Sequence, residues 1–78
     1  MIKKTLKLVI TFHTTTDAMA MESACKAAGA DGRLIPVPPS IDAGCGLAWC
    51  AAPSSEYRLC SLMDAHGIDY QGMYQRMV

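Results

Sequence analysis

The residues best suited to chemistry lie in the middle of the chain, where Cys45 stands between Gly44 and Gly46. Neither glycine has a side chain that could shield the thiol, and both can adopt the positive φ angles that other residues avoid. Successive backbone N–H groups in such a turn can converge on an anion. Because the thiolate is the nucleophilic form of cysteine, a turn of this kind would stabilise it and raise its reactivity. The same pattern is equally compatible with an ordinary turn whose cysteine has no chemical role.

Two further residues could assist this thiol. His13 ends the first predicted strand and is a candidate base, because that strand is expected to neighbour the strand after Cys45. Cys50 is interpreted either as a surface side chain on an open sheet face or as a second exchanging thiol. An extended chain from Cys45 to Cys50 spans roughly 17 Å, whereas a disulfide needs roughly 4.4–6.8 Å between Cα atoms. We therefore expect neither an internal disulfide nor a metal site built from these three residues.

The other two cysteines, Cys25 and Cys60, fall on the apolar faces of predicted helices and are interpreted as small core residues. The chain has no Cys-x-x-Cys pair, so the usual zinc and dithiol spacing is missing. Lys7 interrupts the first apolar run, which is too short for a secretory signal. We therefore expect a cytoplasmic protein with reduced thiols.

Length and charge restrict the class of function. The 78 residues are expected to form a single domain over 1–78, with a core too thin for a deep active site. Seven basic residues balance seven acidic ones, and the basic ones are scattered along the chain. This pattern offers no basic stripe for nucleic acid and no apolar run long enough for a membrane.

Hydrophobic periodicity divides the chain into six elements. Apolar residues alternate in the strand-like segments and recur at helical spacing in the two others. Threonines before Asp17 and serines before Glu56 are expected to cap the helices, which end at Gly29 and Gly67. Prolines mark the second strand as an edge strand. The predicted segments are a strand at 6–13, a helix at 17–28, a strand at 32–38, a strand at 46–52, a helix at 53–66 and a strand at 68–74.

This order predicts an α+β fold of the ferredoxin-like βαββαβ type. Two helices would cover one face of a four-stranded antiparallel sheet with strand order 4-1-3-2. The other face would be open or used in a homodimer. In the third strand, Leu47 and Trp49 should point to one face and Ala48 and Cys50 to the other.

Three segments of the chain, residues 12–22, 32–38 and 43–49, together resemble a small bacterial family of selenium or sulfur carrier-like proteins. The resemblance implies a persulfide or selenide held on the cysteine of the Cys-Gly-Leu-Ala segment, here Cys45. A carrier of this kind is expected to need a donor such as a cysteine desulfurase, a downstream acceptor protein and no cofactor. Pro39 and Cys50 depart from the family pattern, because basic residues are common at both places.

The leading hypothesis is therefore a carrier rather than a turnover enzyme, with sulfur or selenium on Cys45 and a thiolate-stabilising turn at Gly44 and Gly46. The alternative is a binding or regulatory module without catalytic activity. In that case the open sheet face and Trp49 would pair with another protein, and Cys45 would be incidental.

Overall fold

Four strands and two α-helices alternate along the chain in the computed structural model, which describes residues 5–39, 41 and 46–77. The elements in chain order are β1 (Leu6–Thr11), α1 (Thr15–Ala28), β2 (Arg33–Pro36), β3 (Leu47–Ala51), the short 3-10 helix η1 (Pro53–Ser55), α2 (Glu56–His66) and β4 (Gly72–Met77). The predicted βαββαβ order is confirmed.

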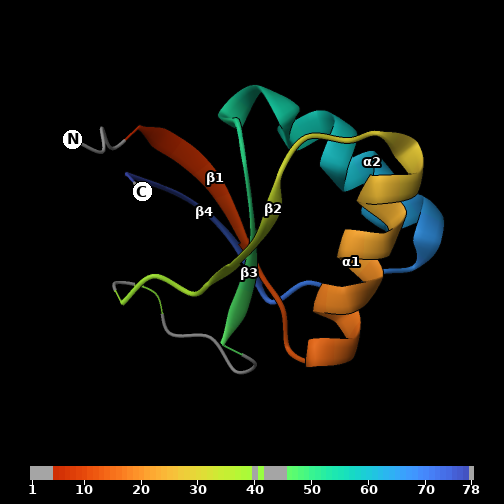
Figure 1. The fold of residues 1–78 in the computed structure, drawn as a ribbon, viewed down its shortest axis with the longest axis horizontal. Coiled ribbons are helices and arrows are strands. Elements are labelled where there is room, and N and C mark those ends of the chain that lie inside the picture. The colour runs from red at the N-terminus through yellow and green to blue at the C-terminus, as the bar shows by residue number, and fades with distance from the viewer. Residues whose placement is uncertain (1–4, 40, 42–45, 78) are drawn as a thin grey trace.

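The four strands form one antiparallel sheet in the order β2-β3-β1-β4. This is the predicted order 4-1-3-2 read from the other edge. Both helices lie on the same side of the sheet (Figure 1). The arrangement is α+β and consistent with the ferredoxin-like fold.

Strand β1 lies at the centre of the sheet, and its alternating side chains are buried on both faces. Leu8 and Ile10 point toward the helices and join the main core. Val9 and Thr11 point to the opposite face, and neither has exposed surface. The alternation of β1 thus places apolar side chains in two separate clusters, one on each face of the sheet.

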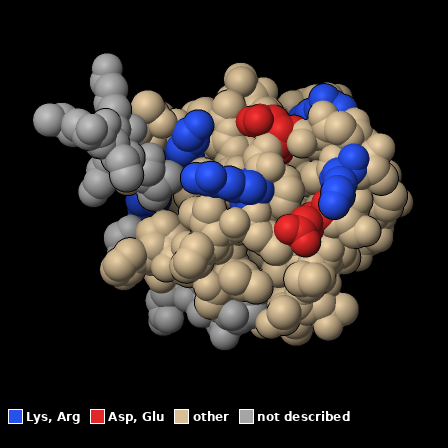
Figure 2. All heavy atoms as spheres, viewed as in Figure 1, with Lys and Arg blue, Asp and Glu red and all other residues tan. Residues whose placement is uncertain are grey.

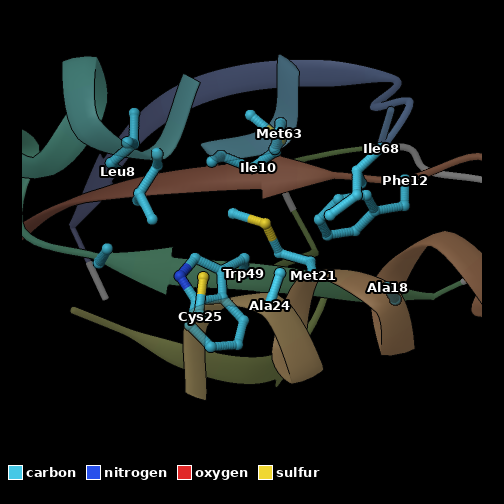
Figure 3. Packing of buried hydrophobic residues seen from close by; sticks show 12 residues of the cluster. Leu8, Ile10, Phe12, Ala18, Met21, Ala24, Cys25, Trp49, Met63 and Ile68 are labelled. Atoms are coloured by element: carbon cyan, nitrogen blue, oxygen red, sulfur yellow. The ribbon is translucent and has the colours of Figure 1, made fainter. Parts of the chain in front are cut away.

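The main core fills the space between sheet and helices (Figure 3). Its members come from β1, α1, β3, α2 and the segment before β4, and almost all are apolar. The buried set is Leu8, Ile10, Phe12, Ala18, Met21, Ala24, Cys25, Trp49, Ala51, Leu59, Met63 and Ile68. The prediction that Cys25 is a core residue is confirmed, while Cys60 is only partly buried against this core.

The helix ends follow the sequence signals with one exception. Thr14 is the N-cap of α1, and its hydroxyl oxygen accepts a hydrogen bond from the Asp17 N–H at 3.2 Å. Gly29 and Gly67 end the helices in the left-handed conformation, as expected. A serine, Ser55, occupies the N-cap position of α2 as predicted, but its side chain makes no capping hydrogen bond. Its hydroxyl instead donates to Asp31 Oδ2 at 3.4 Å.

The last strand begins later than its alternation predicted. Ile68 follows Gly67, the C-cap of α2; its N–H donates to the Met63 carbonyl and its side chain is buried in the core. The Gln71 N–H then donates to the Thr11 carbonyl at 2.7 Å and brings the chain beside β1. Pairing starts at Gly72 and continues to Met77. The alternation of apolar residues therefore did not predict where strand pairing begins.

The position of Trp49 contradicts the pairing role that the alternative function assigned to this residue. It lies on the helix side of β3 with 3% of its surface exposed, next to Ala24 and Cys25 of α1 (Figure 3). Its indole N–H donates to the Asp31 carbonyl at 3.1 Å. Since the ring is covered by α1, Trp49 is unavailable for pairing with another protein.

The turn at Asp31 and Gly32 gives the first testable prediction. Gly32 has φ +117°, and a Cβ there would lie 2.7 Å from the Cys50 carbonyl oxygen and against the Trp49 indole. We expect Gly32→Ala to lower the free energy of unfolding by about 2–3 kcal/mol, through backbone strain and the clash together. Gly29→Ala is the matched control, because Gly29 also has a positive φ but open space around it. Urea unfolding should separate the two variants; equal losses would show that the close approach has no energetic role.

Cys25 gives a second prediction, on pH dependence. Burial raises the pKa of the Cys25 thiol above its ordinary value of 9.0, and the nearby Arg58 charge opposes this shift only in part. Above about pH 9 the unfolded chain therefore loses a proton that the folded chain keeps, so stability falls as pH rises. The stability difference between wild type and Cys25→Ala should be constant near neutral pH and shrink above about pH 9. A difference independent of pH up to about pH 10.5 would contradict this expectation.

Candidate functional site

The candidate site lies at the end of the sheet where β1 finishes and β3 starts. The last described pairs there are Thr11 with Ala48 and Pro36 with Leu47. Gly46 directly precedes this end of β3, and the chain leaves β1 at the same end toward α1 (Figure 1). Cys45 and Gly44 lie outside the described residues, so their predicted roles stay predictions.

Gly46 is the described residue next to Cys45 in sequence, and its backbone is in the left-handed region with φ +77°. A Cβ built on Gly46 meets nothing within 4 Å, so the glycine is required by its backbone angle and not by lack of space. Its carbonyl oxygen accepts a hydrogen bond from the Val37 N–H at 3.0 Å. This bond joins the two ends of the connection between β2 and β3. Whether Gly46 stabilises a thiolate stays a prediction.

Ile41 anchors the same connection to the sheet. Its side chain is 7% exposed and packs with Val9 and Ala48 on the face away from the helices, which we call the second face. Its N–H donates to the Pro38 carbonyl at 2.9 Å. The second face, expected to be open or used in a homodimer, is thus partly covered by the Ile41 side chain. Sequence reasoning missed this anchor, although an isolated isoleucine in a polar, proline-rich stretch was a signal for it.

His13 is exposed and lies two residues beyond the last β1 residue that pairs with β3. Its neighbour Thr14 caps α1 and also donates to Asp17 Oδ2 at 2.9 Å. This cap holds the turn after β1, so His13 lies at the same end of the sheet as Gly46. Its role as a base that activates Cys45 stays a prediction.

Cys50 lies at the other end of β3 and was wrongly interpreted as a surface side chain. It is 8% exposed, because its strand lies between β1 and β2. Val9 of β1 pairs with it on one side and Arg33 of β2 on the other. Its side chain belongs to the second face, as the alternation of β3 predicted. Its part in sulfur exchange is not tested by these contacts.

The described residues contain no cluster of three or more His, Cys, Asp or Glu side chains that could hold a metal ion. In the described part of the chain, no helix is long and apolar enough to cross a membrane. The described part of the connection between β2 and β3 is held by two backbone hydrogen bonds, Val37 to Gly46 and Ile41 to Pro38, and by the buried Ile41 side chain.

Comparison with known proteins identifies the family to which the chain belongs. No curated protein and no solved structure matches the chain. A family model described as "Putative Se/S carrier protein-like" matches residues 7–75, a range that includes β2, β3, most of β1 and β4, and the Cys45 segment. Since the match covers most of the sequence, the chain belongs to this family of Se/S carrier-like proteins.

Proposed function

We propose that the protein carries sulfur or selenium as a persulfide or selenide on Cys45 and passes it to an acceptor protein. The observation that carries this proposal is the family match, which includes the Gly-Cys-Gly segment. The geometry around Gly46 supports it. A carrier thiol needs a protruding sulfur on a rigid support, and the Ile41 anchor and the Val37 bond provide a support of this kind.

Loading from a cysteine desulfurase is a transfer between two thiols. The Cys45 sulfur attacks the terminal sulfur of the donor's persulfide, the donor's S–S bond breaks, and the donor cysteine leaves as a thiolate that takes up the proton. An acceptor thiol removes the sulfur by the same reaction. No net oxidation occurs, so no cofactor is required. We place this exchange in the cytoplasm, where reducing conditions keep the thiols free.

Replacement of the carrier thiol gives the third prediction. After incubation with a cysteine desulfurase and cysteine, intact-mass spectrometry should detect a sulfur adduct on the wild-type chain. Cys45→Ser should abolish the adduct without loss of the fold, because the carrier thiol is the only group removed. Cys50→Ser is the matched control and should retain it. An adduct that survives in Cys45→Ser would exclude this thiol as the carrier.

The support of the turn gives a fourth prediction. Gly46→Ala places a side chain on a backbone with φ +77°, at a cost of roughly 1 kcal/mol. We expect the turn to relax and desulfurase loading of Cys45 to slow. Gly29→Ala imposes a similar strain at the end of α1, outside the candidate site, and should load at the wild-type rate. Equal loading rates in the two variants would show that the Gly46 conformation does not matter for transfer.

A further inference from the structure

A second thiol lies in a hollow at the end of β3 opposite to Gly46. The hollow has a volume of about 250 Å³, several times the roughly 30 Å³ that a water molecule occupies in the liquid. Seven residues line it, and they come from β1, the turn before β2, the start of β2, the end of β3 and the connection after β3. They are Lys7, Asp31, Gly32, Arg33, Cys50, Ala51 and Ala52.

Two cations flank the thiol in this hollow. Arg33 is the direct cross-strand partner of Cys50. Lys7 lies two residues before Val9, the partner of Cys50 on the other side, and therefore shares its face at the diagonal position. Neither cation forms an ion pair with another described residue. The hollow thus combines one nucleophile with two positive charges available to a ligand.

The one acidic residue of the hollow is engaged elsewhere. Asp31 Oδ2 accepts hydrogen bonds from the Ala52 N–H at 2.9 Å and from the Ser55 hydroxyl at 3.4 Å. Its negative charge is thus partly compensated by donors on the β3–η1 connection. Two cations against one hydrogen-bonded carboxylate leave the lining with a net positive charge.

Figure 2 shows the charged side chains on one face of the molecule. Blue Lys and Arg atoms lie over the strands with red Asp or Glu atoms close to them, and both signs also occur over the helices (Figure 2). The described acidic residues other than Asp31 come from α1, α2 and the connection after α2. An anion that approaches the hollow therefore meets two cations and one carboxylate whose charge is partly compensated by hydrogen bonds.

Cys50 itself fits a small ligand better than a protein. Its side chain is more than nine-tenths buried, lines the hollow and forms no hydrogen bond with a described residue. A partner protein's cysteine could not readily reach such a thiol, whereas a small inorganic anion could. We propose that this hollow binds a dianionic sulfane-sulfur compound of the thiosulfate type and that Cys50 accepts its outer sulfur. The choice of sulfur as the transferred atom rests on the proposed function.

The reaction balances without any further reagent. The Cys50 sulfur attacks the outer sulfur of thiosulfate and forms a new S–S bond. The S–S bond of thiosulfate breaks, and sulfite leaves with the electron pair and takes the thiol proton as hydrogen sulfite. Lys7 and Arg33 hold the sulfonate oxygens and stabilise the negative charge on the leaving group. The product is a persulfide on Cys50.

The test uses the full chain and thiosulfate, with intact mass and released sulfite as readouts. We expect one added sulfur atom and one sulfite per chain in the wild type and in Cys45→Ser, and neither in Cys50→Ser or Cys50→Ala. The Lys7→Gln/Arg33→Gln double variant should react more slowly by roughly tenfold or more, as expected for loss of charge-assisted hydrogen bonds. Arg76→Gln is the matched control, because Arg76 lies over the Tyr74 ring and not in the hollow. Sulfate, a dianion without a transferable sulfur, should compete.

Two results would overturn the assignment. One is sulfur transfer that persists in both Cys50 variants or is absent from a folded wild type. The other is a double variant that reacts as fast as Arg76→Gln. Loading by the desulfurase is measured on Cys45 and transfer from thiosulfate is measured on Cys50. Each experiment can therefore be interpreted even if the other gives a negative result. If both Cys50 variants unfold, the comparison of the double variant with Arg76→Gln still decides the question.

Discussion

The structure depends on the burial of β1 from both sides. Leu8 and Ile10 lie under the helices, while Val9 lies under Ile41 on the second face. This strand pairs with β3 and β4 over most of its length, so its register decides which residues meet across the sheet. Hydrophobic burial stabilises this arrangement, and the hydrogen-bonded strand pairing fixes its register. The same pairing positions both ends of β3.

The turn at Asp31 and Gly32 fastens one end of β3. The Asp31 carbonyl accepts from the Trp49 indole, and its carboxylate accepts from the Ala52 N–H. Gly32 lets the backbone pass so close to β3 that a larger residue would collide. A single turn thereby connects the end of α1 to the core and shapes the hollow beside Cys50. At the opposite end, the chain before β3 is held by Val37 and Ile41.

The position of Cys50 follows from this construction. It lies within β3, between β1 and β2, and lines the hollow together with Lys7 and Arg33. At the other end of β3, the chain enters the strand through Gly46, whose backbone is left-handed. In sequence, Cys45 directly precedes this glycine.

Much of the fold could be predicted from the sequence, because alternation, helical spacing and capping residues act locally. Leu8 and Ile10 share a face in any strand, and Gly29 ends a helix whatever packs against it. The family resemblance could point to Cys45 because the motif that carries it, Cys45 with its glycine neighbours, is continuous in the sequence. The βαββαβ order followed from the succession of these local signals.

Contacts between distant segments were decided only by the tertiary structure. The sequence placed Cys50 on the second face, but its burial depends on Val9 and Arg33 in two other strands. Trp49 is hidden because α1 crosses over it, and Ile41 covers a face that periodicity left open. Likewise, β4 begins at Gly72, the residue that pairs with Thr11 of β1. It does not begin where the apolar residues start to alternate. The sequence by itself determined which residues share a face, while packing determined what covers each face, since burial depends on residues far apart in the chain.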